Sequence, residues 1–311
     1  MEGRNEQRAA RFDEAASLLP ARLRRGALSL PLSVRGSGEE LRLRVGQPMT
    51  VVVGPWEQPI PDSPDKLTPQ DLAQVLEVAT RASVHTALEQ VRSGFFTVRG
   101  GHRIGLCGTA ALKDGAILTL RHLSSLAIRV CRAVPGAAEG VISSLRTAET
   151  VADTLILSPP GGGKTTFLRD LVRCLSNGVG GPPLRVGVAD ERGEIAALWE
   201  GRPQLEVGSH TDILEGCPKA DGLMSLLRGM NPQVLAADEI TSPRDITALE
   251  QAAHCGVSLL ATAHASGVED LRRRPLYRSL LALEVFHRAV VVRRTGGRRQ
   301  YQVVELGDGI C

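Results

Sequence analysis

The sequence predicts an α/β protein in which a parallel sheet with helices on both faces follows a smaller α+β domain. Apolar strands alternate with helices through the second half of the chain, a pattern typical of a parallel sheet. The glycine-rich stretch 158–166 joins an apolar strand, 154–157, to a run whose apolar residues recur every three or four positions, as on a helix. Two further strands end in the acidic pairs Asp190-Glu191 and Asp238-Glu239, which places carboxylates at the sheet edge where α/β proteins bind ligands.

The 311 residues, of which 42% are hydrophobic and 23% charged, have the composition of a soluble globular protein with room for two domains. A net charge of +3 is too small to indicate nucleic-acid binding, and an aromatic content of 3% leaves few side chains on which bases could stack. The six cysteines form no Cys-x-x-Cys pair, so neither a zinc site nor a disulfide framework is expected. The charged N-terminus lacks an apolar signal core, and no apolar run reaches the roughly 18 residues of a membrane span. We therefore expect a cytoplasmic protein that binds no nucleic acid and can dock peripherally on a membrane complex.

Residues 1–135 are expected to form the smaller α+β domain. Its expected helices cover about 12–25, 68–83 and 89–93, the second with Thr68 as cap and Pro69 at its first position. Its expected strands cover 41–45, 50–53, 95–98, 102–107 and 126–130, with Gly100-Gly101 as the turn of a hairpin. The four prolines between 55 and 64 predict a loop.

Five arginines lie on or beside these expected strands: Arg42, Arg44, Arg99, Arg103 and Arg129. For each arginine alone, a position on a solvent-exposed face of the sheet is a sufficient explanation. If the glycine-rich stretch 158–166 binds a triphosphate, these arginines as a set are candidates to reach that nucleotide across a domain or subunit boundary.

The glycine-rich stretch has the pattern of a phosphate loop. Its residues are Ser158, Pro159, Pro160, Gly161, Gly162, Gly163, Lys164, Thr165 and Thr166. Glycines let backbone N–H groups approach phosphate oxygens, and the helix N-terminus adds a partial positive charge. Lys164 can reach the β- and γ-phosphates, and the Thr165 hydroxyl can ligate Mg²⁺. The general pattern has glycine where this chain has Ser158, and a Gly/Pro-rich turn without a ligand is the alternative interpretation.

The strand 234–237 and the two acids after it have the arrangement of a Walker B motif. Asp238 is expected to hold Mg²⁺ through a water molecule, and Glu239 can polarise the water that attacks the γ-phosphate. Glu191, at the end of another apolar strand, is expected to assist Glu239.

A third strand, 257–261, ends in Thr262-Ala263-His264, where the histidine could sense the γ-phosphate by hydrogen bonding. A histidine with satisfied hydrogen bonds at a strand end is the alternative interpretation. The phosphate loop, two acidic strand ends and Thr-x-His narrow the class to RecA-like ATPases, so residues 136–311 are expected to form a RecA-like P-loop core. The guanine-selective Asn-Lys-x-Asp motif does not occur in the sequence, which favours ATP as the nucleotide. The remaining expected elements are helices over 219–230 and 242–255 and a closing hairpin of 289–293 and 300–304.

Two longer stretches are more specific than a general ATPase motif. They are 97–108, which contains Gly100-Gly101-His102-Arg103, and 212–220, which contains Gly216-Cys217-Pro218-Lys219. With these stretches and the motifs above, the chain resembles the stage III sporulation protein AA family of endospore-forming bacteria. That family is similar to the secretion ATPases of type II and type IV systems, which have an N-terminal domain, a RecA-like core and hexameric rings.

The resemblance implies roles for four groups of residues. Gly163-Lys164-Thr165-Thr166 would be the Walker A motif, Asp190-Glu191 an acidic box, Asp238-Glu239 the Walker B motif and His264 a His box. It also implies an Mg²⁺-dependent ATP hydrolase that forms a homo-hexamer and energises the channel between mother cell and forespore during sporulation. Its partner would be a membrane protein of the channel complex, reached from the mother-cell side.

Three functions remain open at this point. The first is the ring motor that the resemblance implies. The second is a nucleic-acid-stimulated ATPase, because the RecA-like core also serves helicases. The third is an ATP-loaded scaffold that assembles without turnover. Phosphate release measured with and without single-stranded nucleic acid separates the three.

Overall fold

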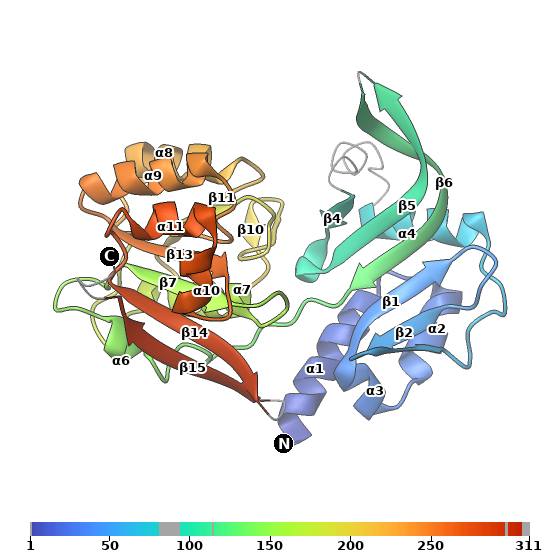
Figure 1. Cartoon of the computed structure of the whole chain (residues 1–311). Helices are drawn as coiled ribbons and strands as arrows, with labels where there is room; N and C mark the ends of the chain where they lie inside the picture. Colours follow the sequence, from blue (N-terminus) through green and yellow to red (C-terminus); the bar gives the residue numbers. More distant parts are fainter. Residues whose placement is uncertain (1, 81–93, 114, 296–297, 307–311) are drawn as a thin grey trace. The chain divides into compact units, whose positions relative to one another are not determined.

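The computed structural model describes residues 2–80, 94–113, 115–295 and 298–306 and divides the chain into two compact units (Figure 1). The first unit is Met1–Arg132 and the second is Ala133–Cys311, against an expected boundary between residues 135 and 136. In the part of the chain that the structure describes, no helix combines the length and the apolar character needed to cross a membrane.

The first unit is built on one six-stranded sheet in which every neighbouring pair is antiparallel. In order across the sheet the strands are β3 (Trp56–Pro59), β2 (Thr50–Val53), β1 (Gly38–Arg44), β6 (Ala116–Arg129), β5 (Arg103–Lys113) and β4 (Phe95–Thr97). The helices are α1 (Glu2–Ala16), α2 (Ala21–Ser29), α3 (Leu32–Ser37) and α4 (Pro69–Thr80), with a 3-10 turn at Arg99–Gly101. Apolar side chains of α1, α2 and α4 and of the inner strands form one buried core.

Two expectations for this unit are wrong. The helix expected over 12–25 is two helices, α1 and α2, because Pro20 has no N–H to continue the first and instead caps the second. The loop expected between the prolines at 55 and 64 contains β3, which pairs with β2 in a tight hairpin. Pro59 is tolerated there because β3 is the edge strand of its sheet and a missing donor on its open side costs nothing. The helix expected over 89–93 lies outside the described residues.

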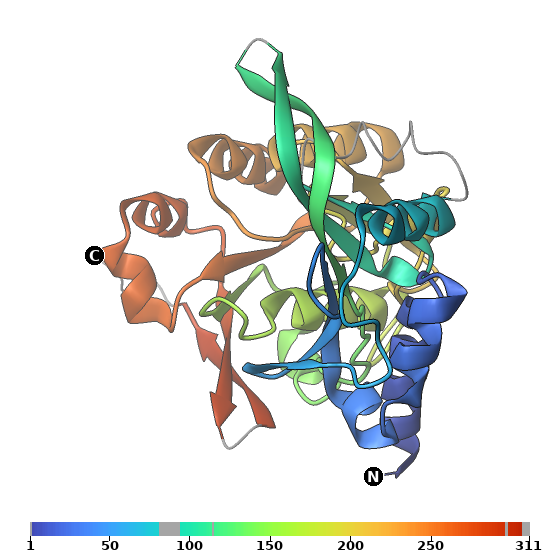
Figure 2. The same cartoon turned by 90° about the vertical axis from the view of Figure 1, so that its right-hand side faces the viewer.

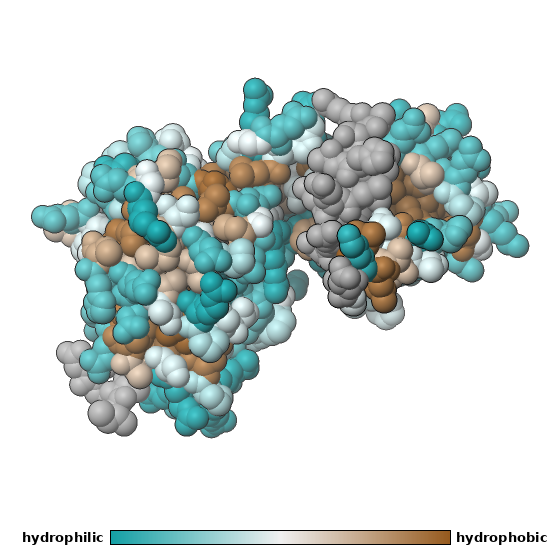
Figure 3. Space-filling view, turned by 90° about the horizontal axis from the view of Figure 1, so that it is seen from above, coloured by the Kyte–Doolittle hydropathy of each residue, from teal (hydrophilic) through white to brown (hydrophobic). Residues whose placement is uncertain are grey.

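Strands β5 and β6 form an arm that is longer than the sequence predicts and extends past the rest of its sheet (Figure 2). The part of β5 beyond Leu106 is largely exposed, so the chain has no burial pattern there to mark a strand. Among the residues that the structure describes, the exposed large apolar residues are Leu28, Leu32, Val45, Trp56, Val78, Leu112, Ile117, Leu118 and Met230. Three of them, Leu112, Ile117 and Leu118, lie near the tip of the arm. Figure 3 shows a face on which small apolar patches are interspersed among hydrophilic side chains.

The second unit is built on a seven-stranded sheet in which only the last pair is antiparallel. In order the strands are β11 (Thr211–Glu215), β8 (Val186–Asp190), β12 (Val234–Ala237), β13 (Ser258–His264), β7 (Thr154–Ser158), β14 (Arg288–Thr295) and β15 (Arg298–Glu305). Every residue of β7, β8 and β12 is buried, as expected for strands covered on both faces. A separate two-stranded ribbon is formed by β9 (Leu198–Trp199) and β10 (Arg202–Pro203).

Helices cover both faces of this sheet, as the alternation of strands and helices predicts. One core holds apolar residues of α8 (Lys219–Met230), α9 (Pro243–His254), α10 (Val268–Arg273) and α11 (Pro275–Leu281). The other core holds those of α6 (Ile142–Leu145) and α7 (Lys164–Ser176). The bounds of α8 are those that the sequence predicts, and Ser242 caps α9 by a reciprocal capping box with Asp245.

Register brings the carboxyl ends of four parallel strands to one edge of the sheet. Ala237 of β12 is paired with Ala189 of β8 and with Ala261 of β13. Ser158 of β7 is paired with His264 of β13. The residues that follow these positions therefore meet at this edge, and they are the ones with which the functional site is built.

Candidate functional site

The glycine-rich loop between β7 and α7 is tightly wound. Gly161 and Gly163 have φ values of +73° and +104°, which other residues rarely adopt. A Cβ atom on Gly162 would lie 1.7 Å from Oγ of Ser158, so a larger residue there clashes with this hydroxyl. Helix α7 begins at Lys164 with no side-chain hydrogen bond from its cap, Gly163, which leaves the first N–H groups of the helix available to an anion.

Lys164 and Thr165 at the start of α7 contact the ends of two other strands. The buried Lys164 places Nζ at 3.1 Å from Nε2 of His264. The Thr165 hydroxyl donates to Oδ2 of Asp238 at 2.6 Å. Thr262, on the strand between them, donates its hydroxyl to Oδ1 of the same carboxylate. Asp238 is therefore held as a hydrogen-bond acceptor from both sides.

Glu239 has an unusual backbone conformation for its residue type, with φ of +55°. Its N–H donates to the Thr262 hydroxyl at 2.8 Å, which fixes the turn that follows β12. Its carboxylate lies 3.0 Å from Nε2 of His264 and 3.2 Å from Nη1 of Arg192. Such a strained backbone persists only where the surrounding contacts hold it in place. Strained residues of this kind cluster at functional sites.

The Nε2 atom of His264 therefore lies between Lys164 and Glu239. Without a proton this nitrogen accepts from the lysine, and with one it donates to the carboxylate, so it cannot satisfy both groups at once. Its Nδ1 atom is buried and has no hydrogen-bond partner among the residues that the structure describes. The alternative that His264 is a fully satisfied strand-end histidine does not fit this geometry.

The two acids at the end of β8 have different environments. Asp190 is buried and accepts backbone N–H groups of residues 194, 195 and 196 at 2.8 to 2.9 Å. Burial raises the pKa of the Asp190 carboxyl, although these backbone hydrogen bonds oppose the shift. Glu191 is half-exposed and forms an ion pair with the buried Lys219 of α8. Asp190 thus holds the loop after β8, while Glu191 remains at the surface of the site.

An open pocket joins the two acidic strand ends. It is lined by Asp190, Glu191, Arg192, Glu194, Lys219, Asp238 and Glu239. The structure therefore brings Glu191 and Glu239 to one pocket, next to the contact between Thr165 and Asp238. Lys219 and Arg192 were missed as site residues in the sequence, although Lys219 belongs to the specific stretch 212–220 and Arg192 directly follows an acidic pair.

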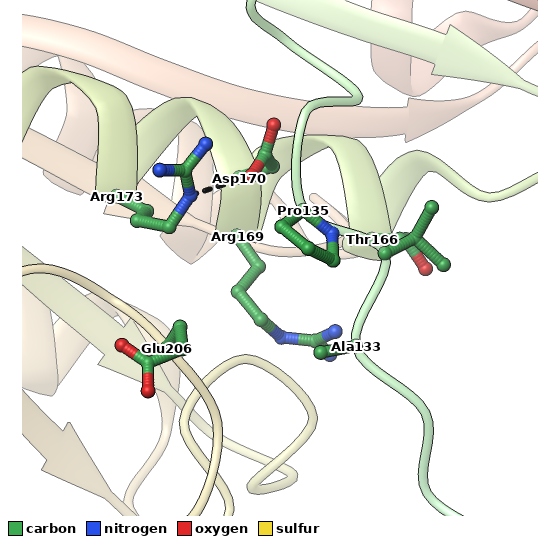
Figure 4. Close-up of a pocket in the computed structure, with 8 residues that line it drawn as sticks. Ala133, Pro135, Thr166, Arg169, Asp170, Arg173 and Glu206 are labelled. Atoms are coloured by element: carbon green, nitrogen blue, oxygen red, sulfur yellow. Dashed lines mark hydrogen bonds and ion pairs between the residues drawn. The ribbon is translucent and has the colours of Figure 1, made fainter. Parts of the chain in front are cut away.

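A second pocket lies beside α7 and is shown in Figure 4. It is lined by Ala133, Val134, Pro135, Thr166, Arg169, Asp170, Arg173 and Glu206. Arg169 donates from Nε to the carbonyl oxygen of Ile195 at 2.6 Å, which connects α7 to the loop after β8. Asp170 accepts the N–H groups of Gly136 and Ala138, at 3.1 and 2.7 Å, and pairs with Arg173 at 2.7 Å.

The five arginines of the first unit have partners within that unit. Arg42 and Arg129 both pair with Glu40. Arg44 pairs with Glu57, and the guanidinium of Arg103 lies 4.5 Å from the ring centroid of Phe95. Arg99 acts electrostatically on the carboxylate of Glu14 and helps to lower its pKa, after the larger effect of the His102 hydrogen bond.

Comparisons with known proteins give a family and a fold. A sequence model of the family "Sporulation stage III, protein AA" matches residues 10–305. The chain is 36% identical over 299 residues to "Stage III sporulation protein AA" of Bacillus subtilis (strain 168), covering 96% of both chains. 

The structure is similar to that of the ATPase DotB of Legionella pneumophila, with a TM-score of 0.57 and 19% identity over 87% of this chain and 78% of that one. It is also similar to the pilus retraction motor PilT with bound ADP, with a TM-score of 0.56 and 14% identity over 88% of this chain and 80% of that one. At such low identities these likenesses establish the fold alone, and they confirm the predicted RecA-like P-loop core.

Proposed function

Because the chain belongs to the sporulation stage III protein AA family, as its motifs predicted, we propose that it is an Mg²⁺-dependent ATPase that hydrolyses ATP to ADP and phosphate. The single observation that carries this proposal is the hydrogen bond between Thr165 and Asp238, formed beside a buried lysine at the mouth of a glycine-rich loop. That contact joins the groups that bind phosphate to the groups that hold a metal and a water molecule.

The loop 158–166 would bind the triphosphate. Its positive-φ glycines and the uncapped start of α7 present backbone N–H groups to phosphate oxygens. Lys164 adds a full positive charge, and its Nζ already lies near His264, where a γ-phosphate would compete for it. The binding of ATP would thus break the contact between Lys164 and His264. In this way the hydrogen bonding of His264 would depend on whether a γ-phosphate is bound.

The oxygen atoms of Thr165 and Asp238 suit Mg²⁺, which prefers hard oxygen ligands and keeps several waters when it binds with a nucleotide. Thr165 Oγ1 would ligate the ion directly and Asp238 through a water molecule. When bound, Mg²⁺ would neutralise charge on the β- and γ-phosphates. The short contact between the two side chains, at 2.6 Å, supports this fit because it already brings both oxygens to one point.

Glu239 would be the general base that takes the proton of the attacking water. Arg192 and His264 hold its carboxylate from two sides, so its position is fixed before substrate binds. Glu191 opens onto the same pocket and would assist by orienting the water, while Lys219 holds Glu191.

In this proposal the protein works as a homo-hexameric ring on the cytoplasmic, mother-cell side of a membrane complex. Hydrolysis would move the first unit and thereby act on a membrane protein of the channel between mother cell and forespore. Family membership and the likeness of the fold to a pilus retraction motor support the motor interpretation.

The experiment that tests this function combines ATP binding, phosphate release and mass. Lys164→Ala should lose ATP binding, whereas the matched surface variant Lys66→Ala should bind as the wild type does. Light-scattering mass with and without ATP tests the ring, and a monomer under both conditions would contradict it. Single-stranded DNA or RNA in the phosphate-release assay should leave the rate unchanged; strong stimulation would favour the nucleic-acid-dependent alternative.

A further inference from the structure

The hairpin of β14 and β15 carries two arginines that face α7. Arg294 and Arg299 are paired in register, and residues directly opposite each other in an antiparallel pair share one face. The next pair on this face is Val292 with Tyr301. Val292 is buried in the core that holds α7, and the ring of Tyr301 packs on that of Phe167 with centroids 4.9 Å apart. Arg294 and Arg299 therefore lie at the end of the hairpin, on the same face as Val292 and Tyr301. This is the face that covers the start of α7.

Arg299 reaches the glycine-rich loop itself. A Cβ atom on Gly163 would lie 2.6 Å from Nε and 2.8 Å from Cζ of Arg299. The guanidinium group is therefore in contact with the backbone of Gly163, the residue directly before Lys164. Glycine is needed at this position for two reasons, the left-handed φ of +104° and the space that Arg299 occupies.

Among the residues that the structure describes, no acidic group balances the charges of this pair. Both arginines are exposed, and no described carboxylate forms an ion pair with either of them. Like charges directly opposite each other destabilise a hairpin. In contrast, Arg42 and Arg129 of the first unit share Glu40. Arg299 lies beside the glycine-rich loop and Arg294 is paired opposite it, so this end of the hairpin favours an anion, and phosphate is the anion that the planar guanidinium fits best.

We propose that Arg299, with Arg294 opposite it, binds the α- and β-phosphates of the nucleotide in cis, from the same chain that supplies the loop. This inference rests on the proposed ATPase function and adds a ligand that the motifs do not contain. In the sheet, β14 lies on one side of β7, and β13, which carries His264, lies on the other. Arg299 therefore approaches the loop from the side away from Glu239 and His264, where the γ-phosphate chemistry takes place.

Because the α- and β-phosphates are common to ATP and ADP, this contact contributes equally to substrate and product binding. A contact of that kind changes the affinity and the KM and not the rate of the chemical step. An arginine that stabilises charge in the transition state would behave differently, because its loss would lower kcat. Kinetics therefore distinguish that role from the role proposed for Arg299.

The test is equilibrium binding of Mg-ATP and Mg-ADP to wild type, Arg299→Ala, Arg299→Lys and Arg293→Ala. Arg293 is paired with Gln300 on the opposite face of the same hairpin, so its variant is the matched control. Arg299→Ala should weaken the binding of both nucleotides by about tenfold, the loss typical of one charge-assisted hydrogen bond. The KM for ATP should rise by the same factor with kcat retained. Arg299→Lys should lie between wild type and Arg299→Ala, and Arg293→Ala should match the wild type.

Unchanged affinity for ADP in Arg299→Ala, or a loss confined to ATP, would overturn the inference. Thermal unfolding of each variant establishes that the exposed substitution leaves the unit folded. Absence of nucleotide binding in the wild type would instead contradict the proposed ATPase function, so the two failures are distinguishable.

Discussion

The Thr165 hydroxyl donates a 2.6 Å hydrogen bond to Oδ2 of Asp238, a residue 73 positions further along the chain. Thr165 follows β7 and the glycine-rich loop, and Asp238 follows β12. These two strands are not neighbours, because β13 lies between them. Thr262 of β13, the strand between them, donates to the other oxygen of the same carboxylate. Side chains from the start of α7, from β13 and from the residue after β12 thus meet at one carboxylate.

Glu239→Gln is expected to separate binding from hydrolysis. The amide keeps the shape of the carboxylate but cannot take a proton, so phosphate release should fall by about 10²–10⁴-fold, the usual contribution of a general base. ATP affinity should stay within a few-fold of the wild type. The control is Glu149→Gln, at an exposed position away from the site. Wild-type turnover in Glu239→Gln would show that another group is the base.

Gly162→Ala is expected to weaken ATP binding, and a second substitution should restore it. The new Cβ would lie 1.7 Å from Oγ of Ser158, but the next atoms it meets are 3.1 Å away. Overpacking of this size costs about 1–3 kcal/mol, which corresponds to roughly tenfold or more in affinity. Ser158→Gly removes the clashing hydroxyl, so the double variant should recover most of the loss. A loss in the double variant equal to the sum of the losses in the two single variants would mean that the clash is not the cause.

Asp170→Ala is expected to destabilise the second unit. Asp170 is buried, accepts two backbone N–H groups from 136–138 and pairs with Arg173, and its presence raises the pKa of that arginine. Removing it leaves these donors unsatisfied, which should lower the free energy of unfolding by about 2–4 kcal/mol in a denaturant titration. Asp221→Ala breaks an exposed pair with Arg244 and should cost less than about 1 kcal/mol. Equal costs for the two variants would contradict the assigned role of Asp170.

Glu57 should make the edge of the first unit sensitive to acid. Hydrogen bonds from Arg44 and Thr50 lower the pKa of this carboxyl from 4.5 to about 2. A folded pKa below the unfolded one gives stability that is present above pH 4.5 and is lost as the pH falls towards 2. Because the group is largely exposed, the effect should stay below about 1 kcal/mol.

The fluorescence of Trp56, the neighbouring residue on β3, can follow this loss in a Trp199→Phe background. Glu57→Gln should reduce the difference between unfolding midpoints in urea at pH 7 and pH 3, and Glu77→Gln on α4 should not. An unaltered pH dependence in Glu57→Gln would assign the acid sensitivity to other carboxyl groups.

The parts of the fold that could be predicted are those with strong local patterns. The strand 234–237 and the helix 219–230 have the bounds that the sequence indicates. The strand is a continuous apolar run, and the apolar residues of the helix recur with helical periodicity. Strand β11 was missed because Thr211–Glu215 is only half-buried at the edge of its sheet and has few apolar residues. The inner parts of β5 and β6 were predicted, but their outer parts were missed, because the part of β5 beyond Leu106 is largely exposed to solvent.

The residue types of the candidate site could be predicted, but their contacts could not. The phosphate-loop pattern and the acidic strand ends identify Lys164, Asp238 and Glu239 without a structure. The contact between Lys164 and His264 joins residues 100 positions apart and depends on the order of strands in the sheet. The approach of Arg299 to Gly163 depends on the register of the β14–β15 hairpin, in which Arg294 is paired with Arg299.

Helix α7 is tied along its length to three parts of its unit. Its first turns lie under Tyr301 and Arg299, Arg169 donates to the carbonyl of Ile195 after β8, and Asp170 holds the segment through which the chain enters the unit. A densely packed helix cannot deform to absorb a displacement at one end. In the proposed function, a nucleotide that displaces the first turn of α7 would therefore either move the helix together with all three attachments or break a buried hydrogen bond.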